Sequence, residues 1–155
     1  MIEEPTFTTG LHYRDPKAAL EWLEQAFGLE VTMAIDGPAE APEMCHYEMA
    51  YEGRGRIMVG AEWADFARSP AGLGGANTQV VHVQVPSGLE EHCERARAAG
   101  ATILDEPSDQ FYGDRTYRVS DLEGHVWTFS MRVRDVTRAE AEEALGQPIL
   151  ATNWA

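Results

Sequence analysis

Two segments of the chain carry apolar residues at the spacing of an amphipathic helix. The first follows Asp15, a capping residue, and a proline that favours the first helical turn. Leu20, Leu23 and Phe27 then share one helical face until a glycine ends the pattern. The second segment begins after a serine, ends at a glycine and repeats this spacing with Leu89, Cys93 and Ala96. The pattern therefore predicts two similar helices, one in each half of the chain.

One strand-like segment precedes each predicted helix and three follow it. In the first half these are residues 6–14, then 30–35, 44–51 and 56–61; in the second half they are residues 78–85, then 101–104, 115–120 and 125–131. The order β-α-β-β-β therefore occurs twice. We expect a single α+β domain over residues 1–155, with module 1 at about 6–62, a linker at about 63–77, module 2 at about 78–133, and a C-terminal helix and tail at about 135–155.

The segment 112–130, YGDRTYRVSDLEGHVWTFS, combines two of these strands with the turn Asp121-Leu122-Glu123-Gly124. This hairpin resembles the closing hairpin of the glyoxalase/bleomycin-resistance/extradiol-dioxygenase (vicinal oxygen chelate) superfamily, especially its PhnB-like branch. The segments 18–28, 46–49 and 91–100 support the resemblance, which covers roughly residues 6–133. It implies two modules that form a curved eight-stranded sheet around a ligand cleft, with the helices on the outer face.

The resemblance also assigns four metal-ligand positions, and none of them carries a metal-binding side chain here. They fall at Thr8, near Met58, at Val80 and at Thr128. Divalent cations at such positions need imidazole or carboxylate donors. We therefore expect a protein without the usual metal site and without a cofactor, unless a divalent metal has been relocated.

The composition excludes several classes of function. A formal net charge of −14 disfavours binding to nucleic acid or to anionic lipid surfaces. The first residues do not resemble a signal peptide, and the apolar runs are too short for a membrane span. Cys45 and Cys93 are isolated thiols, which suit a reducing compartment better than a disulfide scaffold. We therefore expect a cytoplasmic protein.

Alternation along the strands predicts which side chains face the cleft. The apolar sets Phe7, Leu11 and Tyr13, then Val81, Val83 and Val85, and finally Trp127, Phe129 and Met131 are assigned to the helix-covered side. The opposite face then carries the candidate ligand-binding residues His12, His82, Gln84 and Thr128. For His12 and His82, the alternative is an ordinary hydrogen-bonded strand residue.

His46 and Glu48 are the candidate catalytic pair, because side chains two residues apart lie on one strand face and a His-Glu pair can transfer protons. A relocated divalent metal would use His12, His46, Glu48 and His82. A purely structural role for the pair remains the alternative.

Tyr112 and Arg115 are predicted at the mouth of the cleft, where an arginine could bind a carboxylate or phosphate. The alternative for Arg115 is a surface salt bridge. Trp63 is predicted at a lip formed by the linker, with ordinary loop packing as its alternative.

Three functions fit these patterns. The first is a metal-free small-molecule-binding protein. The second is a lyase, isomerase or dioxygenase that uses a relocated divalent metal or the His-Glu pair. The third is a protein-interaction or regulatory module. A homodimer is expected in each case, from the resemblance, from the frequency of two-fold pairing and from Trp154 near the chain end.

Overall fold

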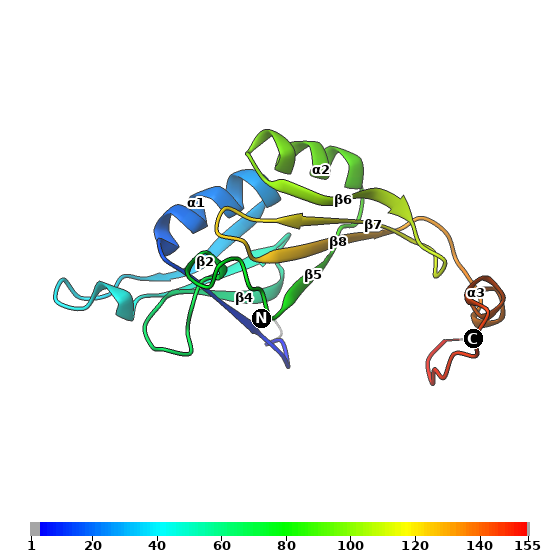
Figure 1. The fold of residues 1–155 in the computed structure, drawn as a ribbon, viewed down its shortest axis with the longest axis horizontal. Helices are drawn as coiled ribbons and strands as arrows, with labels where there is room; N and C mark the ends of the chain where they lie inside the picture. Colours follow the sequence, from blue (N-terminus) through cyan, green and yellow to red (C-terminus); the bar gives the residue numbers. More distant parts are fainter. Residues whose placement is uncertain (1–3, 155) are drawn as a thin grey trace.

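A computed structural model describes residues 4–154 of the chain (Figure 1). Its elements in chain order are β1 (Thr9–Tyr13), α1 (Pro16–Phe27), β2 (Leu29–Ile35), η1 (Pro42–Met44), β3 (His46–Tyr51), β4 (Arg54–Ala61), η2 (Pro70–Gly72), β5 (Val80–Gln84), α2 (Leu89–Ala98), β6 (Thr102–Asp109), β7 (Asp114–Ser120), β8 (Val126–Arg132) and α3 (Arg138–Leu145). This order confirms the two predicted βαβββ modules and the α+β class.

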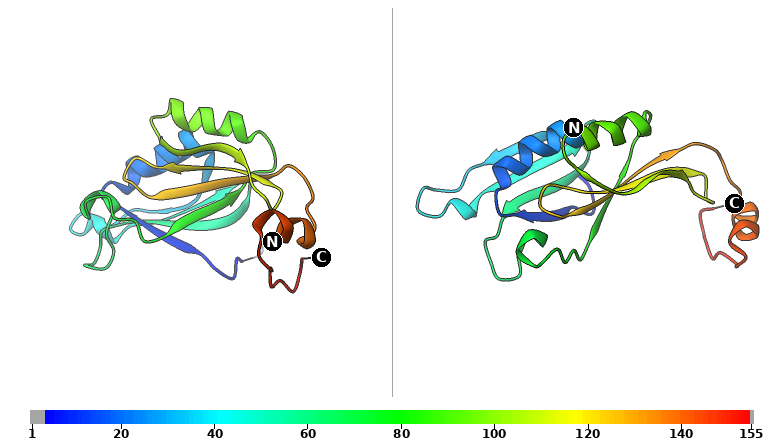
Figure 2. Two further views of the ribbon diagram at one scale, coloured as in Figure 1. Left: turned by 45° about the vertical axis from the view of Figure 1, so that its right-hand side comes forward. Right: turned by 45° about the horizontal axis from the view of Figure 1, so that its top comes forward.

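The eight strands form two four-stranded sheets, in the orders β1-β4-β3-β2 and β5-β8-β7-β6. In each sheet the first strand of the module pairs in parallel with the last, and the remaining pairs are antiparallel. Helices α1 and α2 lie on the same side of the molecule, each over its own sheet (Figures 1 and 2). In the part of the chain that the structure describes, neither α1 nor α2 covers the other face of a sheet, and the two sheets do not close into one barrel (Figures 1 and 2).

The hydrophobic core lies between the helices and the helix-covered faces of both sheets, as strand alternation predicts. Leu11 and Tyr13 of β1 and Trp127 and Phe129 of β8 are all fully buried in one cluster. Phe7 is an exception to the predicted set, because its side chain is 91% exposed. The prediction of Phe7 on the helix side is therefore wrong, since β1 starts only at Thr9 and the preceding residues leave the strand pattern.

Polar contacts join the end of α1 to α2. Arg95 donates from Nε to the carbonyl of Gln25 at 2.7 Å and from Nη2 to that of Glu24 at 2.7 Å. The buried His92 donates from Nε2 to the carbonyl of Phe27 at 2.9 Å. Because a carbonyl can only accept, Nε2 of His92 carries a proton. These contacts add side-chain donors to carbonyls in the last turn of α1, where the carbonyl of Glu24 also accepts the N–H of Gly28.

Nδ1 of His92 accepts a 2.6 Å hydrogen bond from the hydroxyl of Tyr117 on β7. His92 therefore links α1, α2 and β7 as a neutral imidazole. Burial lowers the pKa of His92 below its ordinary value of 6.5.

The edge strand β6 extends five residues beyond the predicted segment 101–104. The extra residues are polar and include Pro107, so they show no alternation that would indicate a strand. A proline is tolerated in an edge strand because one side of the strand needs no hydrogen-bond partner. The pairing of β6 with β7 is irregular at two places, which fits this composition.

Helix α3 and the following tail lie at one end of the molecule, away from α1 and α2 (Figure 1). The indole nitrogen of Trp154 donates to the carbonyl of Val136 at 2.8 Å, so the tail folds back on the start of this segment. Trp154 is only partly exposed, which weakens the sequence argument that used it as a free docking residue. In the described part of the chain, no helix is long and apolar enough to cross a membrane.

The first prediction concerns the pH dependence of stability. Because the folded-state pKa of His92 is depressed, the unfolded chain takes up a proton that the folded chain resists as the pH falls through about 6.5. We expect the free energy of unfolding to fall more steeply between about pH 7 and pH 5 than in His92→Gln, by at most about 1.4 kcal/mol per pH unit. Urea titrations at a series of pH values measure this slope.

His82→Gln is the matched control, because His82 is exposed. Its pH slope should equal that of the original chain. Equal slopes for the original chain and His92→Gln would contradict the assigned role of His92.

Candidate functional site

A cleft of about 720 Å³ lies between β5 and the β3–β4 hairpin. Apolar side chains from both modules line it, including Leu29, Met49, Ile57, Val81 and Trp127. Most of these side chains belong to the hydrophobic core, so the cleft is an opening into the core between the two sheets. An opening of this size and lining is typical of a small-molecule site.

Strand β5 forms one wall of the cleft with an unpaired backbone edge. Among residues 4–154 it pairs with β8 alone, and the backbone N–H of Val85, the residue after the strand, donates to the carbonyl of Ser130 at 2.8 Å. Because successive residues of a strand direct their backbone groups to opposite edges, the N–H and C=O groups of Val80, His82 and Gln84 point away from β8. His82 and Gln84 line the cleft, as does every residue from 80 to 86.

The opposite wall begins at the tight turn between β3 and β4. Glu52 and Gly53 have φ angles of 47° and 70°, the left-handed conformation that a two-residue hairpin turn requires. This turn brings Arg54 and Arg56, at the start of β4, to the cleft. Arg132, at the end of β8, is the third arginine that lines it.

The predicted pair His46 and Glu48 lies beside this wall and is in contact. Nε2 of His46 lies 3.2 Å from Oε1 of Glu48. Nε of Arg56 lies 3.3 Å from the other oxygen of Glu48, whose side chain is only 14% exposed. Both oxygens of Glu48 thus have a basic partner. The carboxylate therefore positions the Arg56 guanidinium as well as the imidazole.

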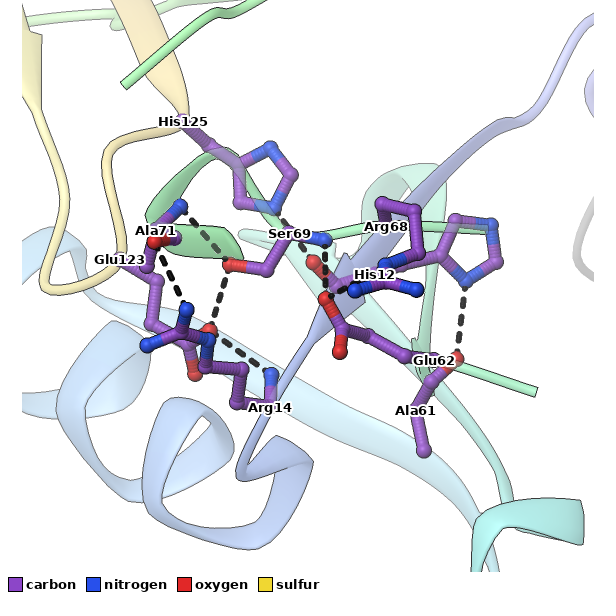
Figure 3. Close-up of polar contacts among 9 residues, drawn as sticks. All are labelled: His12, Arg14, Ala61, Glu62, Arg68, Ser69, Ala71, Glu123 and His125. Carbon is purple, nitrogen blue, oxygen red and sulfur yellow. Dashed lines mark hydrogen bonds and ion pairs between the residues drawn. The ribbon is translucent and has the colours of Figure 1, made fainter. Parts of the chain in front are cut away.

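A second, more polar cavity of about 360 Å³ lies between β1 and the linker, and His12, Phe66 and His125 contribute to its lining. Figure 3 shows how the two imidazoles are held. Nδ1 of His12 lies 3.2 Å from the carbonyl of Ala61, and Nε2 of His125 lies 2.8 Å from the carbonyl of His12. Each of these nitrogens donates, because a carbonyl oxygen can only accept.

The carboxylate of Glu123, in the β7–β8 turn, fixes the linker over this cavity (Figure 3). It accepts hydrogen bonds from the backbone N–H of Arg14 at 2.7 Å and from the hydroxyl of Ser69 at 2.6 Å. The Arg14 side chain also donates to the carbonyl of Ala71 at 2.8 Å. The linker is therefore attached to both modules.

The structure separates the residues that the sequence assigned to one binding face. His82 and Gln84 line the larger cleft, whereas His12 lines the smaller cavity. Trp63 and Tyr112 line neither of these two openings. Thr128 is buried, and its hydroxyl lies 3.4 Å from Nε of Arg118.

Arg115 lies away from both openings and is already paired. Its Nε lies 2.6 Å from Asp109, and it also forms an ion pair with Glu90 of α2. The contact with α2 places Arg115 on the helix-covered side, together with Tyr117. Hydrogen bonding to the Arg115 guanidinium lowers the pKa of both Glu90 and Asp109. The expected position of Arg115 at the mouth of the cleft is therefore wrong, and the salt-bridge alternative describes it.

The four metal positions implied by the resemblance do not fit a metal ion. Val80 has no donor atom, Met58 offers a thioether, and Thr8 and Thr128 offer neutral hydroxyls. Among residues 4–154, no group of three or more His, Cys, Asp or Glu side chains is arranged to hold a metal ion. Accordingly, no three of the candidate ligands of a relocated site, His12, His46, Glu48 and His82, converge.

Sequence reasoning missed the arginines of the larger cleft. Arg54 and Arg56 stand two residues apart at a hairpin turn in a strongly acidic chain, and this local excess of positive charge was the available signal. Phe7, which alternation predicts on the helix-covered side, lines the cleft instead.

Two tandem βαβββ modules, with a ligand-sized cleft between β5 and the β3–β4 hairpin, define the class of protein. The chain belongs to the Glyoxalase/Bleomycin resistance protein/Dioxygenase superfamily, whose family model matches residues 8–129. TioX from Micromonospora sp. ML1 is 34% identical, with a TM-score of 0.63 over 84% of this chain and 100% of TioX.

Two further comparisons agree with this assignment. An uncharacterised protein of Mycobacterium tuberculosis is 27% identical over 146 residues, which are 92% of this chain and 83% of that protein. TnmS3, an antibiotic-binding protein from Streptomyces sp. CB03234, is 15% identical, with a TM-score of 0.61 over 85% of this chain and 98% of TnmS3. The likeness to TnmS3 concerns the fold.

Proposed function

We propose that this protein binds a small, largely apolar organic molecule in the cleft between β5 and the β3–β4 hairpin, without the metal site used by other members of its superfamily. The observation that carries the proposal is the cleft itself, with about 720 Å³ of space and walls of core side chains such as Met49 and Trp127. Ligand pockets of proteins have volumes of roughly 300 to 1,000 Å³ and are mostly apolar.

The cleft also has polar groups at defined positions. These favour specific binding of one class of molecule, whereas apolar walls alone would adsorb any hydrophobic compound. The backbone edge of β5 offers hydrogen-bond donors and acceptors at His82 and Gln84, opposite the arginines of the hairpin. The antibiotic-binding protein TnmS3, which shares the fold, also favours a ligand-binding role.

A homodimer is part of the same proposal. Met33 and Ile35 on β2 and Val80 on β5 are 43%, 53% and 53% exposed. Met33 and Val80 lie on the helix-free faces of the two sheets, where a second copy could cover them. Closed two-fold pairing is the commonest assembly of soluble proteins.

Filling the cleft tests the proposed site. We expect the neutral fluorescent probe N-phenyl-1-naphthylamine to bind, and Val83→Trp to weaken its binding about ten-fold or more, because the indole would occupy the space between the two walls. Fluorescence titration measures the Kd. Leu122→Trp, in the exposed β7–β8 turn, is the control and should leave the Kd unchanged. An equal Kd for all three proteins would reject this cleft as the site.

Metal titration tests the proposal that the protein binds its ligand without a metal ion. A tightly bound ion would raise the melting temperature through mass action. We expect Zn²⁺, Ni²⁺, Fe²⁺ and Mn²⁺ to leave the Tm unchanged, and purification without chelator to yield no stoichiometric metal. Stoichiometric metal with a raised Tm, abolished by His46→Ala or Glu48→Ala, would instead support a relocated site.

Sedimentation at micromolar concentration tests the assembly. We expect a species of twice the chain mass of 17.2 kDa. Met33→Glu, which places a charge on the exposed sheet face, should shift the equilibrium to the single chain. A single-chain species across the whole concentration range would contradict the homodimer.

A further inference from the structure

We propose that the molecule bound in the cleft carries a carboxylate, phosphate or sulfonate group, that Arg56 binds this group, and that Glu4 occupies the same guanidinium in the ligand-free protein. This inference rests on the proposed function, because it names the class of ligand for the same cleft. Its basis is the set of charged side chains around the cleft, which binding of a purely apolar molecule would not require.

The charge of the cleft is opposite to that of the chain. The chain has 26 acidic residues and 12 lysines and arginines. Nevertheless Arg54, Arg56 and Arg132 all line the cleft, and none of the described residues that line it is an aspartate or glutamate. An apolar cleft with only basic charged groups in its lining favours an amphipathic anion over a neutral or cationic molecule.

Arg132 is held by an internal partner. Its Nε lies 2.8 Å from the carboxylate of Asp114, whose side chain is 7% exposed. The hydroxyl of Ser130 donates to the same carboxylate at 2.7 Å. The Arg132 side chain is 57% exposed, but a ligand that took its Nε would deprive the buried Asp114 carboxylate of its cation, so Arg132 contributes charge near the cleft rather than the main contact.

Arg56 is arranged differently, because its two partners differ in burial. Glu48 holds Nε at 3.3 Å and is largely buried, whereas Glu4 contacts Nη2 at 2.6 Å and is 78% exposed. Glu48 therefore orients the guanidinium through Nε, and Glu4 takes up one of its outer donors, at Nη2. An exposed ion pair of this kind contributes only about 0–1 kcal/mol, so another anion can replace Glu4 at little cost.

The position of Glu4 places the replacement of its carboxylate by a ligand anion at the cleft. Glu4 belongs to the segment that precedes β1, and Phe7 of the same segment lines the cleft although its side chain is 91% exposed. The segment thus runs along the cleft and brings a carboxylate to Arg56. Because the planar fork of arginine matches carboxylate and phosphate oxygens, a ligand with such a group could bind where Glu4 now lies.

Two probes with the same ring system separate the charge from the apolar part. 1-Anilinonaphthalene-8-sulfonate is anionic, and N-phenyl-1-naphthylamine is its neutral counterpart. We expect the sulfonate to bind more tightly than the neutral probe. Arg56→Gln should raise the Kd of the sulfonate about ten-fold or more and leave that of the neutral probe unchanged, because charge-assisted hydrogen bonds are lost only with the anion.

Glu4→Gln should act in the opposite direction. It removes the competing carboxylate and should lower the Kd of the sulfonate about two- to five-fold, with no effect on the neutral probe. Glu4 is exposed, so this variant tests the proposal even if Arg56→Gln does not fold. Arg138→Gln on α3 is the control for the change in net charge and should alter neither Kd.

The outcomes distinguish this inference from the proposed function. If Val83→Trp blocks both probes but the sulfonate binds no better than the neutral probe, or is insensitive to Arg56→Gln and Glu4→Gln, the cleft binds apolar molecules and the anionic class is wrong. If Val83→Trp affects neither probe, the proposed site itself is wrong. Sensitivity of the sulfonate alone to Arg56→Gln and Glu4→Gln, with both probes blocked by Val83→Trp, supports both proposals.

Discussion

The buried carboxylate of Asp121 joins the two modules, and the position of the cleft depends on this connection. Oδ2 of Asp121 accepts hydrogen bonds from the Tyr13 hydroxyl at 2.7 Å and from the Trp127 indole at 3.1 Å, while Oδ1 accepts from two backbone N–H groups of its own turn. Burial, followed by the charge of Asp121, raises the pKa of Tyr13, so its hydroxyl remains a donor. One side chain thus connects β1, β8 and the closing turn, and its four acceptor contacts offset the cost of burying it.

Other polar contacts join the modules as well. The carbonyl of His12 on β1 accepts from His125, and Gln79 bonds to Thr9 and Gly10 at the start of β1. His92 and Arg95 join α2 to the end of α1. Strand β1 begins only at Thr9, so the residues before it lie outside the sheet. In the described part of the chain, no strand pairs with the free edge of β5. Apolar side chains of both modules, such as Ile57 and Val81, line the cleft there. Because β1 starts at Thr9, the preceding segment with Glu4 and Phe7 is not part of the sheet.

The sequence predicted the module order and the strand faces, because both follow from local periodicity and from glycines that end helices. His46 and Glu48 are in contact, as their spacing on one strand implied. Arg115 was misplaced although alternation from Tyr117 already assigned it to the helix side. The cleft could not be predicted, because it depends on where β1 ends and on how two modules distant in sequence pack together.

The net negative charge of the chain does not argue against an anionic ligand. Charges separated by more than about 8 Å are largely screened at physiological ionic strength, so most of the acidic surface contributes little inside the cleft. Arg56 is a third as exposed as Glu4, with 24% against 78% of the side chain accessible, and the Arg56 guanidinium is correspondingly less screened. The local field on a bound molecule is therefore set by the arginines in the wall and by the carboxylates that hold them. Glu48 holds the guanidinium of Arg56 and Asp114 holds that of Arg132, both as structural partners. The exposed Glu4 is therefore the acidic group whose removal changes the charge of the cleft most.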